Sequence, residues 1–465
     1  MLIRNAEIWC RSGQSGRADV RIEDDRIAAI GALEPRPGET WIDAQGGALL
    51  PGLHDHHIHL AALAVRRSSL WCGPPQVMDE AALAAAIAQA PGTGWLRGIG
   101  YHDSVAGMLD KAQLDRLALA RPLRIQHRSG RMWFFNSAGL EALRGSDVAP
   151  PPGLDLATGR LFDADAWLRT TLAGSPPDFS EISRELAACG VTGLTDMSPA
   201  NDAVMAQHFA QQIAVQALLQ RTDLAGTLGL SFTPTPLLRA SHAKLHLHEA
   251  DLPDWDTGLG FIRAAHAQDR SVAIHCASEV ELVFALALYR EAGTLTGDRI
   301  EHASVASDEL VAQIAELGLA VVSQPHFIAE RGDEYRADVD AADLPHLYRL
   351  RAFLDAGITL AGGSDAPFGA ADPWAAMQAA TMRQTPSGAL IGPTEALTPE
   401  QALALFLADP LDLRRTRQIV PGAPADLCLL DRPWGEARSR LTSADVRATF
   451  VAGRIVHQRI DQSPL

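Results

Sequence analysis

Short apolar segments that end abruptly in polar residues recur through the middle of the chain. Each is followed by an Ala/Leu-rich stretch of helical character, and the segments lie at 122–128, 193–197, 243–249, 271–277, 299–304, 320–326 and 359–365. Repeated strand–helix units predict a parallel sheet. Because the units are numerous and no Gly-rich dinucleotide fingerprint accompanies them, we expect an α/β fold built on a (β/α)8 TIM barrel rather than a doubly wound sheet.

The residues after Ser307 illustrate the helical half of such a unit. Ser307 is a good N-cap residue, and Gly318 stands where a helix-ending glycine belongs. Between them, a single apolar stripe has helical spacing and consists of Leu310, Val311, Ile314 and Leu317. The pattern predicts an amphipathic helix that packs on the sheet.

The two ends of the chain resemble each other and differ from the middle. Val20 and Ile22 alternate with polar residues near the N-terminus, and near the C-terminus the apolar segment 425–430 precedes a hairpin with its turn at Ala452-Gly453. We expect residues 1–52 and 418–465 to form one small composite β-sandwich domain. Residues 53–417 then form the barrel, with a long insertion after its first strand. Two long loops, at about 60–94 and 329–345, are candidates for a lid.

Composition and charge exclude several classes of function. Lys and Arg number 40 and Asp and Glu number 56, so the formal charge is −16, which does not suit a general nucleic-acid binder. No apolar run approaches the roughly 18 residues of a transmembrane helix, and the N-terminus does not resemble a signal peptide. The five cysteines are widely spaced, which argues against a disulfide framework. We expect a cytoplasmic protein with a small-molecule substrate and neither a nucleic-acid nor a membrane partner.

The segment 51–60, Pro-Gly-Leu-His-Asp-His-His-Ile-His-Leu, carries the most chemistry. His57 and His59 are two residues apart on an expected strand, so both rings point to the same face. Two imidazoles on one side of a strand end supply half of a divalent metal site.

Three further expected strands also end in residues that can ligate a metal. His275 ends one strand, His302 ends the next, and Asp365 ends a later one. The carboxyl ends of barrel strands meet at one face, where such barrels keep their chemistry. The sequence therefore predicts that four histidines and one carboxylate converge on one mouth. These ligands suit zinc, and they also hold iron, manganese, cobalt or nickel.

This order of residues resembles the amidohydrolase superfamily over nearly the whole chain. The motifs that carry the resemblance are Pro51-Gly52 with Asp55, the segment Gly297–His302, the turn Gly363–Pro367, Asp372-Pro-Trp374 and the tail Pro421–Leu427. They resemble most the branch often called amidohydrolase family 3, which includes formamide deformylases and many uncharacterised cyclic-amide or N-acyl hydrolases.

The resemblance implies a role for each candidate ligand. His57 and His59 would bind the more buried metal together with Asp365, and His275 and His302 would bind a second ion or complete a mononuclear site. Lys244 stands where the superfamily often carries a carboxylated lysine that bridges two metals. We expect zinc as the cofactor, as one or two ions.

The same resemblance implies a reaction, a metal-dependent hydrolysis of a non-peptide C–N bond in a small polar substrate. A bound metal lowers the pKa of its water, and the hydroxide attacks the carbonyl. Asp365 then acts as base and acid, with His302 beside it as a second catalytic residue. Alternatives are an aminohydrolase of a heterocycle and a lactone or ester hydrolase. A non-catalytic binding protein would show gaps in the ligand set, and the set is complete.

Candidate substrate contacts come from the strand ends and from one segment in which this chain departs from the family's usual sequence. Where relatives usually carry an Asp-Gly-His stretch before Asn136, this chain has Ser129 and Arg131 in place of the Asp and His. Arg131 would pair there with a substrate carboxylate. His246 and His248 share a strand face with Lys244 by alternation, and Gln324 and His326 follow another strand; His246, Gln324 and His326 complete the predicted substrate contacts. Barrels of this kind often pair, so a homodimer is a further expectation.

Overall fold

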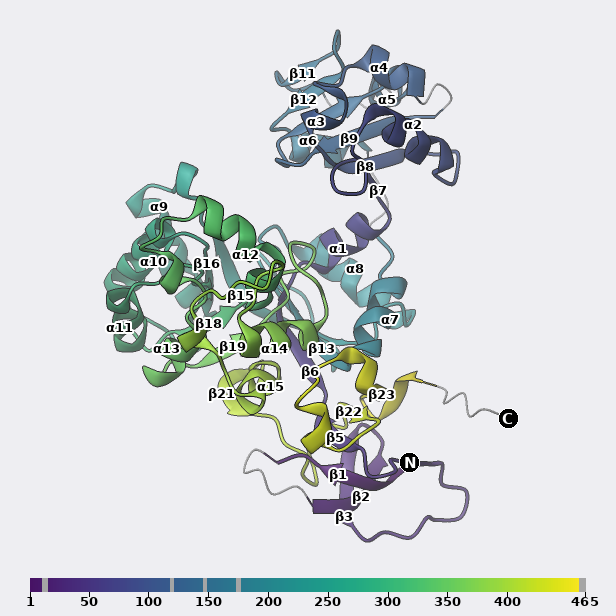
Figure 1. Cartoon of the computed structure of the whole chain (residues 1–465), viewed down its shortest axis with the longest axis vertical. Helices are drawn as coiled ribbons and strands as arrows, with labels where there is room; N and C mark the ends of the chain where they lie inside the picture. The colour runs from purple at the N-terminus through teal and green to yellow at the C-terminus, as the bar shows by residue number, and fades with distance from the viewer. Residues whose placement is uncertain (11–15, 118–120, 145–148, 173–176, 460–465) are drawn as a thin grey trace. The chain divides into compact units, whose positions relative to one another are not determined.

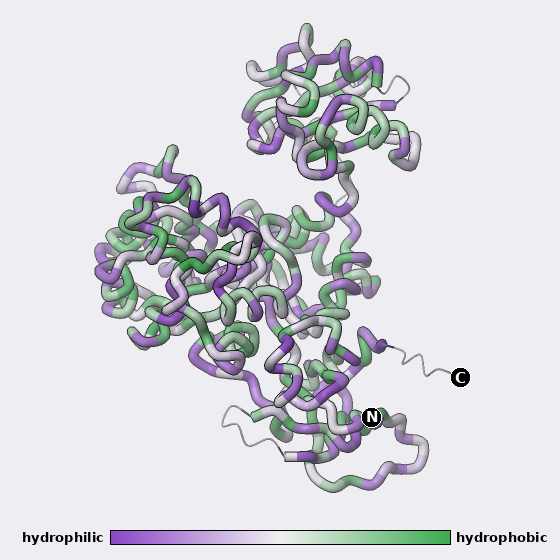
Figure 2. The backbone as a smooth tube through the Cα atoms, in the orientation of Figure 1, coloured by the Kyte–Doolittle hydropathy of each residue, from purple (hydrophilic) through white to green (hydrophobic). Residues whose placement is uncertain are grey.

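The computed structural model describes residues 1–10, 16–117, 121–144, 149–172 and 177–459. The chain divides into two compact units, one made of Met1–Leu60 with Asp178–Leu465 and the other of Ala61–Pro177 (Figure 1). Hydrophilic and hydrophobic stretches alternate along the backbone of each unit (Figure 2). Among the described residues, no helix combines the length and the apolar character that crossing a membrane requires.

The first unit contains an eight-stranded sheet in which all strands are parallel. Its strands, in chain order, are β6 (Leu53–Ile58), β13 (Val191–Asp196), β14 (Arg221–Gly226), β15 (Leu238–His246), β16 (Val272–Cys276), β17 (Arg299–His302), β18 (Ala320–Ser323) and β19 (Leu360–Gly362). The end strands β6 and β19 lie against each other, which nearly closes the sheet. An α/β fold with the eight-stranded parallel sheet expected of a TIM barrel is therefore present.

Helices follow most barrel strands and surround the sheet (Figure 1). They are α7 (Ser180–Ala188), α8 (Ala203–Ala214), α9 (Trp255–His266), α10 (Glu279–Ala292), α11 (Asp308–Glu316), α12 (His326–Asp338), α13 (Leu350–Asp355), α14 (Pro373–Met382) and α15 (Pro399–Leu407). The predicted helix after Ser307 is α11: the Ser307 side chain accepts from Leu310 N, and Gly318 has φ 66°. Leu310, Val311 and Ile314 are buried as the stripe predicts.

Two expectations about the middle of the chain are wrong, and one barrel strand was not predicted. The segment 122–128 contains β9 (Leu123–His127), but this strand lies in a sheet of the second unit and not in the barrel. The barrel strand that the apolar pattern missed is β14, because the polar Arg221 and Asp223 interrupt it. The segment 329–345 is not a long loop: α12 continues to Asp338, and the short 3-10 helix Leu344–His346 follows.

Both ends of the chain contribute to one mixed sheet in the first unit. From the N-terminal side come β1 (Leu2–Ile8), β2 (Gly16–Glu23), β3 (Arg26–Gly31), β4 (Trp41–Asp43) and β5 (Ala48–Pro51), and from the C-terminal side β22 (Leu427–Leu430), β23 (Val446–Val451) and β24 (Arg454–Gln458). Strand β5 pairs with both β1 and β22, which joins the two halves. Hydrogen bonds make this a single sheet, and a sandwich of two layers stays a prediction.

The expected hairpin at the C-terminal end joins β23 to β24. Its turn residues Ala452 and Gly453 have φ 48° and 75°. Positive φ at both central residues is the geometry of a tight turn whose twist matches that of the strands.

The second unit is an α/β body with its own sheet, in the order β11, β12, β10, β9, β8, β7. The strands are β7 (Leu70–Trp71), β8 (Leu96–Tyr101), β9, β10 (Met132–Phe135), β11 (Leu154–Asp155) and β12 (Arg160–Phe162). The helices are α2 (Glu80–Gln89), α3 (Asp103–Ala106), α4 (Lys111–Leu117), α5 (Ser137–Arg144) and α6 (Asp165–Leu172), preceded by α1 (Leu60–Arg67). The expected loop at 60–94 therefore contains α1, β7 and α2.

Candidate metal centre

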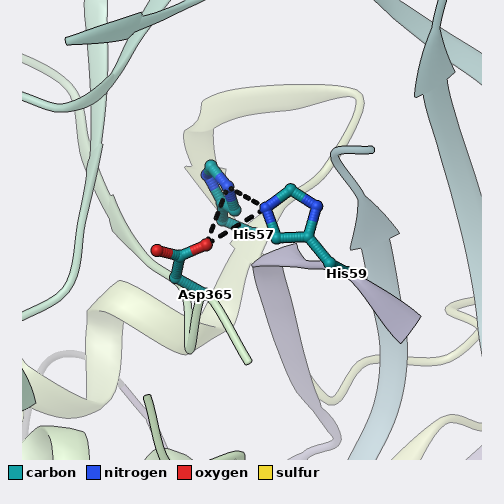
Figure 3. Close-up of side chains that lie close together, drawn as sticks. All are labelled: His57, His59 and Asp365. Carbon is teal, nitrogen blue, oxygen red and sulfur yellow. Dashed lines mark hydrogen bonds and ion pairs between the residues drawn. The ribbon is translucent and has the colours of Figure 1, made fainter. Parts of the chain in front are cut away.

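Three of the six predicted metal ligands converge on one point (Figure 3). His57 Nε2 lies 3.4 Å and His59 Nε2 lies 3.1 Å from Asp365 Oδ1, and the two nitrogens are 3.4 Å apart. Each residue offers one ligating atom, and these atoms all lie within 4.8 Å of one another. Two imidazole nitrogens and a carboxylate oxygen are the donors that a catalytic divalent metal uses in proteins.

The backbone around Asp55 holds this geometry. The Asp55 carboxylate accepts from His57 N at 3.1 Å and from Ser364 N at 2.9 Å, and Asp365 N donates to His57 O at 2.7 Å. These bonds tie the end of β6 to the segment that follows β19. Burial raises the pKa of Asp55 to about 6. Asp55 entered the sequence analysis as part of a motif, and the structure shows it as the link between two ligand-bearing segments.

Glu301 fixes the ring of His57. His57 Nδ1 lies 2.5 Å from Glu301 Oε2, and Glu301 Oε1 accepts from Arg299 Nε at 2.5 Å. All three side chains are buried. A carboxylate on Nδ1 keeps the proton there and leaves the Nε2 lone pair facing the centre. Sequence reasoning missed Glu301 because only the histidine after it stood at the strand end.

His302 is oriented in the same way by Gln324. His302 Nδ1 donates to Gln324 Oε1 at 2.7 Å, and His302 Nε2 is buried without a partner among the described residues. Burial lowers the pKa of His302. The ring lies 4.7 Å from that of His57, centroid to centroid. An unpartnered buried nitrogen beside the three converging ligands fits a further metal ligand.

His275 and His246 extend this row of rings along the strand ends. The His275 ring is 4.4 Å from that of His302, and the His246 ring stacks on His275 at 4.2 Å. Burial lowers the pKa of both rings, that of His246 to about 4. His246 ends β15, where the residue is exposed overall although one face of its ring is covered by His275. His248 lies beyond the strand, where its ring accepts from Ala250 N, so the alternation expected to continue from Lys244 stops at His246.

Lys244 lies inside the barrel on β15. Its side chain is buried, and its Nζ has no hydrogen-bond partner among the described residues. Burial lowers the pKa of this amine to about 8. Buried lysines are rare unless paired, so the bare Nζ of Lys244 is an unusual polar atom among the described residues.

Three of the four residues predicted to contact the substrate form hydrogen bonds with other residues of the chain. Gln324 is fully buried against His302. His326 is also buried, and its Nε2 donates to Ser364 O at 2.9 Å. Arg131, in the second unit, forms two hydrogen bonds with the Asp163 carboxylate, at 2.8 and 2.6 Å. Of the four predicted contacts, His246 is the one that lies exposed at a strand end of the barrel.

A ligand cluster at the carboxyl ends of an eight-stranded parallel sheet defines a class of protein, the barrel metallohydrolases. The amidohydrolase family matches residues 40–254 and 259–457. The chain belongs to this family, as its motifs predicted, and is a hydrolase of C–N bonds other than peptide bonds.

Individual relatives match over almost their whole length. The N-substituted formamide deformylase of Arthrobacter pascens is 26% identical over 547 residues, which covers 99% of this chain and 98% of that protein. The putative amidohydrolase YtcJ of Bacillus subtilis is 23% identical over 95% of this chain and 96% of its own. The crystal structure of an uncharacterized metal-dependent hydrolase from Pyrococcus furiosus has a TM-score of 0.75 at 20% identity, over 93% of this chain and 98% of that one, and shares the fold.

Proposed function

We propose that the protein hydrolyses a small N-acyl or N-formyl amide with the help of a divalent metal held by His57, His59 and Asp365. The observation that carries the proposal is the convergence of their three ligating atoms within 4.8 Å, with Glu301 on the far side of His57. Similarity to a formamide deformylase supports the choice of amide.

Zinc is the metal that we propose. Imidazole and carboxylate ligands suit it, and when bound it would lower the pKa of a water and polarise the carbonyl of the substrate. His302 and His275 would complete the site. We also propose that Lys244 is carboxylated, because a carbamate would turn its bare amine into an anionic oxygen donor.

Asp365 is the group that we assign to proton transfer. Its Oδ1 faces the two imidazoles, and its other oxygen points away from them (Figure 3). Burial opposes ionisation, but the hydrogen bond with His59 and the nearby His57 and His302 outweigh it and lower the pKa of Asp365. The carboxylate is therefore ionised at neutral pH, ready to take a proton from water and to return it to the leaving nitrogen. An amine leaves readily only when it is protonated.

Metal content and activity together test this function. Protein purified without chelator is measured for metal per chain and assayed on a panel of formamides and N-acyl amides. About two equivalents support a binuclear site bridged by Lys244, and about one supports a mononuclear site. Asp365→Asn is expected to lose activity, whereas the exposed Asp355→Asn serves as a matched control with full activity. Failure to bind any metal after reconstitution would contradict the proposal.

A further inference from the structure

Arg331 is a half-buried cation that no carboxylate neutralises within the part of the chain that the structure describes. It lies on α12, where its guanidinium donates to the Phe368 carbonyl and sits 4.5 Å from the centroid of the Phe327 ring. Tyr335 also lies within reach. By contrast Arg336, five residues further along the helix, pairs with Asp333. Arg331 therefore keeps its positive charge free for another partner.

Phe368 places an apolar surface beside the metal centre. Its N donates to Asp365 O at 2.7 Å, and its ring meets the His59 ring edge-on, with 5.8 Å between centroids. The side chain is 57% exposed. An exposed aromatic ring in contact with a metal-ligand histidine offers a surface for the apolar part of a substrate.

Helix α12 and the segment after β19 are tied together at several points. His326 donates to Ser364 O, Ala370 N donates to the Glu330 carboxylate at 2.9 Å, and Arg331 holds the Phe368 carbonyl. Asp365 and Phe368 belong to the same short segment, and Arg331 holds that segment at the Phe368 carbonyl.

We propose that Arg331 binds a carboxylate of the substrate while Phe368 contacts an apolar group of the same molecule. This rests on the proposed function and narrows it to amides that carry a free carboxylate. A guanidinium recognises a carboxylate with charge-assisted hydrogen bonds. Arg131, the arginine expected to do so from the sequence, already holds Asp163.

A matched pair of substrates tests the charge alone. N-formylphenylalanine and N-formylphenylalaninamide share the formyl group and the aromatic ring and differ in the carboxylate. The wild type is expected to favour the acid at least 10-fold in kcat/KM. Arg331→Met should raise KM for the acid roughly 10- to 100-fold, since a hydrogen bond to a charged group contributes about 1.5–3 kcal/mol. It should change KM for the amide less than about 3-fold, and Arg331→Lys should restore part of the loss.

The controls separate recognition from a structural role. Arg336→Met on the same helix should leave both substrates unaffected. Equal losses on both substrates in Arg331→Met, or a wild-type preference for the neutral amide, would overturn the inference and leave the hydrolase function intact. If the metal-loaded protein cleaves neither compound, the proposed function fails for formamides. Calorimetric binding of the same two compounds then tests the role of Arg331. Binding of the acid that Arg331→Met abolishes supports the inference; binding of neither, or binding that the substitution leaves unchanged, overturns it.

Discussion

Three histidines at the centre have their Nδ1 atoms occupied, and each by a different partner. His57 is held by Glu301, His59 by the Ser198 hydroxyl at 3.2 Å and His302 by Gln324. Each contact fixes the orientation of a ring and leaves Nε2 for another ligand. Glu301 is charged, whereas Ser198 and Gln324 are neutral, so removing the carboxylate should have a different effect from removing a neutral partner.

Glu301→Gln should weaken metal binding by about 10- to 100-fold, the usual loss when a carboxylate behind a ligating histidine is removed. The amide is nearly the same size but lacks the charge that keeps the proton on His57 Nδ1. Competition with a chelating dye measures the metal Kd. Glu395→Gln is the matched control, because Glu395 is also a buried carboxylate paired with an arginine, Arg349, but outside the centre. Equal weakening in both variants would show that the loss is general.

Gln324→Leu should lower kcat by about 10- to 100-fold with little change in KM, because the side chain contacts His302 and is fully buried. Gln324→Glu keeps an acceptor for His302 Nδ1 and should retain more activity than the leucine variant. Steady-state kinetics on one amide distinguishes the two roles. A large rise in KM with unchanged kcat would instead support the substrate contact expected from the sequence.

The sequence located candidate ligands but not the residues that orient them. His57, His59 and Asp365 could be predicted because each stands at a strand end, and strand ends meet. The orienting roles of Glu301 and Gln324 could not, since their partners lie on other strands and the pairing depends on the register of the sheet; Gln324 was predicted only as a substrate contact. The ion pair of Arg131 with Asp163 could not be predicted either, because the two residues are 32 positions apart in the chain.

At the level of elements, the Asp372-Pro-Trp374 motif is a helix start. The Asp372 side chain accepts from Trp374 N and from Ser443 Oγ, and Pro373 occupies the first turn of α14. Asp372→Ala should lower the free energy of unfolding by about 0.5–2 kcal/mol, while Asp372→Asn should lose less. Urea unfolding measures this. Because the residue caps a helix, kcat/KM should stay near the wild-type value, and a selective loss of activity would contradict the structural role.

Strands and helices could be predicted where the local hydrophobic pattern matched the burial of their side chains. Strands β16, β18 and β19 read as apolar segments because the sheet is covered on both faces. Strand β14 did not, since the buried Asp223 pairs with Arg239 of the next strand. Helix α12 was mistaken for a loop because its second half, Glu330–Asp338, is mostly charged and lacks an apolar stripe. Its position comes from buried residues at its start, Phe327 and Ile328, and from the contacts with the segment after β19.

On the scale of the whole molecule, the centre joins parts of the chain that are far apart in sequence. His57 and Asp365 are separated by about 300 residues, yet β6 and β19 are the two strands that close the barrel. A metal held between them would cross-link that closure. The centre should therefore contribute to the stability of the first unit as well as to catalysis.

Removing the metal should lower the melting temperature of the protein. Binding to the folded state alone at a free concentration 100 times the Kd contributes about 2.7 kcal/mol, which corresponds to roughly 4 °C for a unit of this size. Differential scanning calorimetry with chelator, and then with added zinc, measures the shift. Asp365→Asn should show a much smaller zinc-dependent rise, because it removes the ligand that the segment after β19 contributes to the junction, whereas Asp355→Asn should match the wild type. An equal rise in the Asp365 variant would mean that zinc stabilises the protein at some other site.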